Sequence, residues 1–188
     1  MRFLNKLFGR DGALETDARR IYTILMAQSR KPAFYGETKF ADDYDGRIDV
    51  LTVHIAAILS NLNRFGENGE RLGQALFDEM KDDFEIALRE EALSDGSVKK
   101  QIQPMISLFY DRVKKYAEAL NQADKRESVH AAFSETLKLD ADETKQSPTE
   151  ETFISQITTY LLAFDAGLSE LLIGDIAMTN FEFPKTPA

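Results

Sequence analysis

The stretch VKKQIQPMISLFYDRVKKYAEAL, residues 98–120, carries the longest uninterrupted apolar stripe in the chain. Its apolar side chains recur at intervals of three and four residues, which places them on one face of an α-helix. The stripe consists of Val98, Ile102, Met105, Ile106, Phe109, Val113, Tyr116 and Leu120. This spacing predicts a long amphipathic helix whose apolar face is turned towards a core.

The same periodicity predicts further helices over about residues 16–30, 45–65, 71–91, 128–137 and 150–172. Thr16 and Asp45 are the expected N-caps of the first two, and Pro32 ends the first because the residue before a proline avoids helical geometry. Gly66 and Gly69 supply a turn before the third. No alternating strand pattern extends beyond a few residues. We therefore predict an all-α fold, a single-domain bundle of five to six amphipathic helices.

A chain of 188 residues fits one domain. We divide it into a basic N-terminal segment over residues 1–15, a helical domain over residues 16–175 and a C-terminal tail over residues 176–188. Aromatic side chains in the connection between the first two helices, at Phe34 and Phe40, are expected to hold that connection in an ordered conformation. An acidic loop over residues 139–151 precedes the last long helix.

The charge of the chain restricts its partners. The net charge of −9 argues against a nucleic-acid partner, because neutralising phosphates needs clustered Lys and Arg. The charge is unevenly spread: residues 1–31 hold seven basic and three acidic side chains, a net +4, so the remainder carries −13. The chain has no Cys, which excludes disulfides and thiolate metal sites and fits a reducing compartment.

The N-terminal residues are basic and aromatic. They lack the apolar core of a secretory signal, and no apolar run in the chain approaches the roughly 20 residues that a membrane-spanning helix needs. A short basic and apolar segment can lie in the headgroup region of a membrane, although it binds weakly by itself. We therefore predict a peripheral membrane contact through Arg2, Phe3, Leu4, Lys6, Leu7 and Phe8.

The sequence offers no catalytic constellation. Neither His54 nor His130 stands in a nucleophile–base motif, and no glycine-rich phosphate loop is present. Glu127 and His130 have the spacing of half a carboxylate-bridged di-iron site, but Leu51 stands where His54 would need its glutamate. We expect no enzyme activity, no catalytic residue, no metal and no cofactor. His54 keeps two further interpretations, as a structural histidine or as a ligand in a haem- or small-ligand-binding protein.

Several phrases in the same order resemble the ubiquinol–cytochrome c chaperone family. They are KPAFY (residues 31–35), DGRIDVL (45–51) followed by His54, QALFDEM (74–80), VKK (98–100) leading to Met105, and FYDR (109–112) followed by Tyr116. The resemblance covers about residues 16–122. On these phrases the chain is identified as a bacterial-type member of that family.

The resemblance implies a non-catalytic assembly factor that binds cytochrome b, or another subunit, during biogenesis of the cytochrome bc1 complex. It also implies a cytoplasmic location, peripheral at the bacterial inner membrane. An acidic body would suit the basic cytoplasmic loops of membrane proteins. A generic helical interaction scaffold is the alternative. The motif positions give these candidate partner-binding residues: Asp45, Arg47, Asp49, His54, Gln74, Asp78, Arg89, Asp95, Tyr110, Arg112 and Tyr116.

Overall fold

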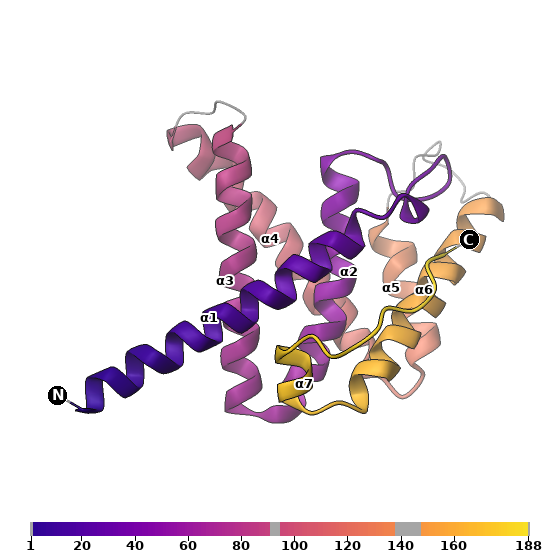
Figure 1. Ribbon diagram of the computed structural model, residues 1–188. Coiled ribbons are helices and arrows are strands. Elements are labelled where there is room, and N and C mark those ends of the chain that lie inside the picture. The colour runs from indigo at the N-terminus through magenta and orange to yellow at the C-terminus, as the bar shows by residue number, and fades with distance from the viewer. Residues whose placement is uncertain (1, 91–94, 138–147, 188) are drawn as a thin grey trace.

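The computed structural model describes residues 2–90, 95–137 and 148–187, except for the side chains of residues 2–11, 90, 95, 99 and 148. These residues form seven α-helices, and the prediction of an all-α fold in one domain is confirmed (Figure 1). The helices are α1 (Arg2–Ser29), α2 (Tyr44–Leu62), α3 (Glu67–Glu90), α4 (Asp95–Ala119), α5 (Lys125–Thr136), α6 (Pro148–Ser169) and α7 (Ile173–Ala177). Short 3-10 turns at Pro32–Phe34 and Asn63–Phe65 stand before and after α2.

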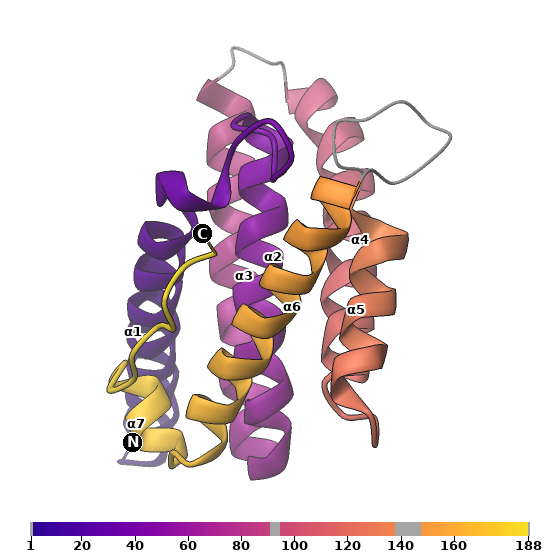
Figure 2. The same ribbon diagram turned by 90° about the vertical axis from the view of Figure 1, so that its right-hand side faces the viewer.

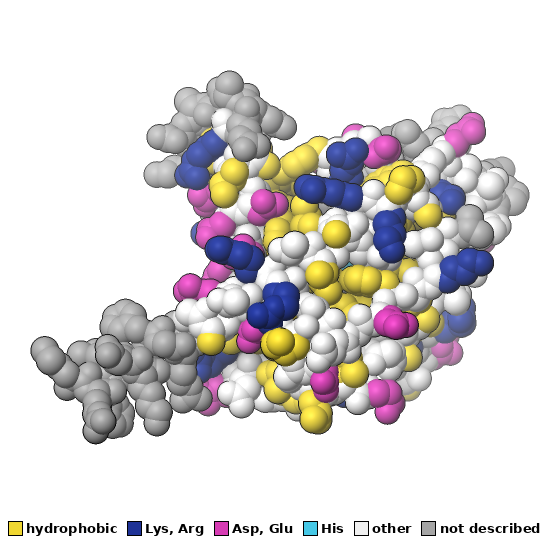
Figure 3. Space-filling view, viewed as in Figure 1, with side chains coloured by type: hydrophobic (Ala, Val, Ile, Leu, Met, Phe, Trp, Pro, Cys, Tyr) yellow, Lys and Arg dark blue, Asp and Glu magenta, His cyan; other side chains and the backbone are white. Residues whose placement is uncertain are grey.

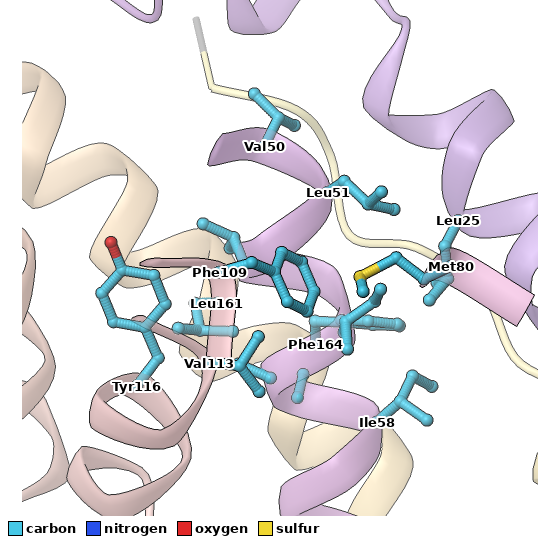
Figure 4. Close-up of a cluster of buried hydrophobic side chains, with 14 of the residues drawn as sticks. Leu25, Val50, Leu51, Ile58, Met80, Phe109, Val113, Tyr116, Leu161 and Phe164 are labelled. Atoms are coloured by element: carbon cyan, nitrogen blue, oxygen red, sulfur yellow. The ribbon is translucent and has the colours of Figure 1, made fainter. Parts of the chain in front are cut away.

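Helix α2 is the centre of the fold. It contacts α1, α3, α4 and α6, while α5 packs on α4 and α6 (Figures 1 and 2). Every residue from Val50 to Ile58 is buried, as expected for a helix that is apolar all round and enclosed by its neighbours. Figure 4 shows the cluster that results, in which Leu51 and Ile58 of α2 lie among side chains of four other helices. The labelled neighbours include Leu25, Met80, Phe109, Val113 and Phe164.

The start of α1 was predicted wrongly. Thr16 does not cap a helix, because α1 already runs through it and the Thr16 hydroxyl donates a 2.7 Å hydrogen bond to the Gly12 carbonyl. A threonine inside a helix can satisfy its hydroxyl in this way, so its presence alone does not mark a helix start. α1 therefore crosses the boundary predicted between residues 15 and 16, and the division into segments stays a prediction.

Two other helix starts also differ from the expectation. The N-cap of α2 is Asp43 and not Asp45, since the Asp43 carboxylate accepts a 2.9 Å hydrogen bond from the Gly46 N–H. Helix α3 begins at Glu67 because Gly66, with φ of 56°, makes the turn by itself. Gly69 is already helical, and a Cβ at this position would overlap the Leu62 carbonyl.

The connection between α1 and α2 is ordered by aromatic packing. Phe34 and Phe40 are fully buried. The Phe34 ring meets the Tyr160 ring edge-on at 5.3 Å, and the Phe40 ring meets Phe153 at the same distance. The connection is thus anchored on α6, and this positions the N-terminus of α2 and the acidic residues that follow it.

Candidate functional site

The upper parts of α3 and α4 stand away from the N-terminal end of α2 and leave a notch (Figures 1 and 3). On the side of α1, a cavity of about 140 Å³ is lined by apolar side chains that include Met26, Leu51 and Phe84. On the side of α5, a second cavity of about 310 Å³ is lined by Phe40, Leu108 and other residues of α2 and α4. Ile48 lines both cavities. We call the two cavities and the ridge between them the α2 notch.

A contact between two helices forms this ridge. Tyr44, in the first turn of α2, donates from its hydroxyl to the Met105 sulfur of α4 at 3.7 Å. Ile48 lies one helical turn after Tyr44. The methionine sulfur is a polarizable atom and a weak hydrogen-bond acceptor, and its side chain is flexible. This contact between α2 and α4 is therefore weak and can adapt its geometry.

Most of the exposed large apolar side chains lie on the helices that border the notch. Of the six large hydrophobic residues that are exposed in the described part of the chain, four lie on the α2 N-terminus or on α3 and α4. They are Tyr44 (40% exposed), Ile86 (52%), Leu108 (53%) and Tyr110 (56%). Tyr44 and Leu108 line the notch itself, and exposed apolar side chains beside a cavity mark an interaction site more often than they serve the fold.

The rim of the larger cavity is acidic. Asp43, Asp45 and Asp49 line it, against one cation, Arg112. Arg112 forms an ion pair with Asp49, and both side chains are more than four-fifths buried. Arg112 also donates to the Thr136 carbonyl at the end of α5. Since Asp49 is compensated within the protein, the charge of the larger cavity comes mainly from Asp43 and Asp45, while Arg30, Arg47 and Asp83 line the smaller cavity.

A separate groove lies between α3 and α4, beside the C-terminal end of α2. It encloses about 630 Å³, and Gln74, Phe77 and Tyr110 lie on its wall. The Phe77 and Tyr110 rings meet edge-on at 6.2 Å. Gln74 donates a 2.9 Å hydrogen bond to Asp78 on the outer face of α3. Helices α2 and α3 approach closely here because Gly73 of α3 carries no Cβ, which leaves room for Leu59 of α2.

The structure divides the predicted partner-binding residues into separate groups. Asp45, Asp49 and Arg112 line the larger cavity, and Arg47 lines the smaller one, where it also pairs with Asp42 at 3.0 Å. Gln74 and Tyr110 line the groove, with Asp78 beside them.

The remaining predicted residues lie elsewhere. Arg89 pairs with Glu85 at 3.2 Å, one helical turn apart. The Asp95 side chain and those of Arg2, Phe3, Leu4, Lys6, Leu7 and Phe8 fall outside the described side chains, so the predicted membrane contact stays a prediction. His54 and Tyr116 are in the core, at 0% and 1% exposed, and have no surface for a direct contact in this conformation.

His54 is the centre of a buried polar network. Its Nδ1 lies 2.7 Å from the Val50 carbonyl and its Nε2 lies 2.8 Å from the Tyr160 hydroxyl, which accepts a further hydrogen bond from Gln28 at 2.9 Å. Burial lowers the pKa of His54 to about 4 and raises the pKa of Tyr160. Both ring nitrogens have protein partners, which is the geometry of a structural histidine and not of a haem ligand.

Sequence reasoning did not predict Tyr44, Ile86 and Leu108 as site residues. A signal exists for two of them: Ile86 and Leu108 are large apolar residues that lie outside the apolar stripes of α3 and α4, whereas Tyr44 continues the α2 stripe one turn before Ile48. Leu108, for example, follows Met105 and Ile106 and precedes Phe109, and it faces away from the stripe that these residues form. Large apolar residues out of register with a helical stripe are the ones that the fold cannot bury.

The fold and the notch define a class of protein: an all-helical body that carries exposed apolar side chains beside a cavity with an acidic rim. The chain belongs to the ubiquinol-cytochrome C chaperone family, whose sequence model matches residues 37–183. The match includes the C-terminal third, where the sequence phrases are less distinctive. Membership of a chaperone family implies a non-enzymatic role.

A solved structure agrees with this assignment. The crystal structure of the Cbp3 homolog from Brucella abortus is similar with a TM-score of 0.76 and 25% sequence identity, and the similarity covers 97% of each chain. A search of curated proteins gave no match. Within the described ranges, no helix combines the length and the apolar character that crossing a membrane requires.

Proposed function

We propose that this protein is an assembly chaperone of the cytochrome bc1 complex that binds newly made cytochrome b, or another subunit of that complex, through the α2 notch. Membership of the chaperone family supports the assembly role. The observation that carries the choice of surface is the exposure of Tyr44 and Leu108, which line the two cavities of the notch. Exposed side chains of this size suit the apolar helices of a membrane subunit before it is assembled.

The acidic rim adds a second element of recognition. Cytoplasmic loops of membrane proteins carry an excess of Lys and Arg. Such a loop would meet Asp43 and Asp45 at the mouth of the larger cavity, while the adjoining apolar helix end covers Leu108 and Met105. Charge complementarity of this kind speeds encounter and fixes orientation more than it raises affinity, so binding should weaken as salt is raised.

We also propose a peripheral location at the membrane where the client is inserted, with the basic residues before Asp11 in the headgroup region. Flotation with vesicles that contain anionic lipid tests this part separately. Binding that is unchanged after Arg2, Lys6 and Arg10 are replaced by Gln would remove the N-terminal segment from the proposal.

The test of the notch is capture of cytochrome b from detergent-solubilised membranes with the tagged chain. Leu108→Lys places a charge in the notch at a position that is already 53% exposed, so the fold should tolerate it. We expect this variant to retain less than a tenth of the captured cytochrome b. Leu172→Lys is the matched control, since Leu172 is 71% exposed at the α6–α7 turn, away from the notch.

Two results would count against the proposal in different ways. Equal capture by both variants and the unaltered chain would leave a chaperone whose client surface is not the notch. Absence of every bc1 subunit from the capture, together with normal bc1 levels in a deletion strain, would reject the assembly role and favour a generic helical scaffold.

A further inference from the structure

The C-terminal residues after α7 form an extended strap, defined here as residues 180–187. The strap leaves α7 and runs back along the molecule between α1 and α6 (Figures 1 and 2). It has no regular secondary structure. Phe181 and Phe183 are partly buried on either side of the exposed Glu182; Pro184 is also partly buried, Lys185 is exposed and Pro187 is buried. This is the pattern of an extended peptide that lies with one face in a channel.

Side chains alone hold the strap in place. The rings of Phe181 and Phe183 pack on Phe164 of α6, with centroid distances of 5.7 and 5.1 Å. Phe183 also covers the His54 ring at 5.6 Å. Within the described residues, no backbone–backbone hydrogen bond joins residues 181–187 to the helices. Because no backbone ladder fixes the strap, its position depends on two aromatic anchors.

The channel is wider than the strap that lies in it. Between the strap and α6, a cavity of about 700 Å³ is lined by Ser155, Gln156 and Thr159 on one side and by Pro184 and Lys185 on the other. The Thr159 hydroxyl on this wall donates to the Ser155 carbonyl at 2.9 Å and accepts from Arg126 at 3.2 Å. The channel therefore has apolar sockets for an extended chain, next to a cavity with a partly polar wall.

The turn that directs the strap is strained. Thr179 has φ of 58°, a left-handed conformation that a β-branched residue adopts only at a cost. Two hydrogen bonds that close the end of α7 hold this turn: Thr179 N–H donates to the Ile176 carbonyl at 3.0 Å, and Asn180 N–H donates to the Asp175 carbonyl at 2.8 Å.

We propose that the channel between α1 and α6 is a second polypeptide-binding surface, separate from the α2 notch. Its ligand is an extended segment of a partner protein that carries aromatic residues at alternate positions followed by proline. The strap, with Phe181, Phe183 and Pro184, is the intramolecular occupant and detaches to admit such a segment. A channel that accepts this sequence from its own chain has the sockets to accept it from another chain.

The test uses the full chain with Phe181→Ala and Phe183→Ala, which removes both anchors. The probe is a fluorescent synthetic peptide with the sequence of residues 180–187, NFEFPKTP. By anisotropy, the variant should bind the peptide saturably and at least about tenfold more tightly than the unaltered chain, whose own strap competes. A peptide in which both Phe are Ala should not bind. The chain with Glu182→Ala and Lys185→Ala is the matched control and should behave as the unaltered chain.

Failure of the peptide to bind a variant that circular dichroism shows to be folded would overturn the proposal and leave the strap as part of the core. If the variant does not fold, hydrogen exchange of the unaltered chain tests whether the strap detaches. A detachable strap requires the amides of Phe183 and Lys185 to exchange much faster than those of α6, by a local opening. If the strap amides and the α6 amides both exchanged only through global unfolding, the proposal would also be overturned. Neither experiment involves cytochrome b, so the outcome is independent of the proposed function.

Discussion

Acidification is expected to destabilise this fold through His54. The His54 ring is completely buried, and burial lowers its pKa from 6.5 to about 4. As the pH falls below 6.5, the unfolded chain takes up a proton at this residue while the folded chain does not. The folded state is therefore at its full stability above the unfolded pKa and loses stability as the pH falls from 6.5 to about 4.

The size of the effect follows from the two pKa values. A difference of about 2.5 units, at about 1.4 kcal/mol per unit, gives a limiting loss of about 3 kcal/mol, most of it reached at about pH 4.5. Small domains are stable by only about 5–15 kcal/mol, so a loss of this size should be plain in a denaturation curve. Carboxylates also titrate at these pH values, and the His54 contribution must be isolated by a variant.

The assay is urea unfolding followed by circular dichroism between about pH 7.5 and pH 4.5, for the unaltered chain and His54→Gln. Glutamine keeps a polar group near Tyr160 but does not titrate. The stability advantage of the unaltered chain over the variant should shrink by about 2–3 kcal/mol across this range. His130→Gln is the control, because it removes the other histidine and retains His54. Parallel loss of stability in the unaltered chain and in His54→Gln would refute the reasoning.

Three further substitutions test the packing. Gly69→Ala should cost about 2–3 kcal/mol in thermal unfolding because its Cβ would overlap the Leu62 carbonyl, whereas Gly167→Ala, with nothing near the added Cβ, should gain about 0.5–1 kcal/mol. Arg112→Gln leaves Asp49 largely buried without its cation and should cost about 2 kcal/mol in urea unfolding. The double change of Arg112→Met with Asp49→Leu should recover most of that loss. A double variant no more stable than Arg112→Gln would show that the ion pair itself stabilises the fold.

The helices could be predicted because their apolar spacing is local information. The stripe from Val98 to Leu120 predicts α4 to within a few residues, and the dense apolar run around Leu51 predicts α2. Helix starts were less predictable. Thr16 and Asp45 both have the chemistry of an N-cap, but Thr16 lies inside α1, and Asp43 caps α2 in place of Asp45. Cap identity depends on where the preceding chain is anchored, which for α2 is set by Phe40 on α6.

The site could be predicted only in part. Asp49 and Arg112 could each be named from the sequence phrases, but their ion pair joins residues 63 positions apart and needs the α2–α4 packing to be known. His54 was named as a candidate partner-binding residue from its position in a sequence phrase, but it is buried. Its burial depends on Tyr160 and Phe183, which lie more than 100 residues away along the chain and contact the His54 ring.

The central position of α2 has a consequence for the synthesis of this protein. α2 is complete once residue 62 has been made, but α6, which covers one of its faces, ends at residue 169. At usual elongation rates the interval is roughly 5–20 s. During that time the nascent chain displays an apolar helix that α6 does not yet cover. A chaperone built around such a helix is itself exposed to aggregation until its last third emerges.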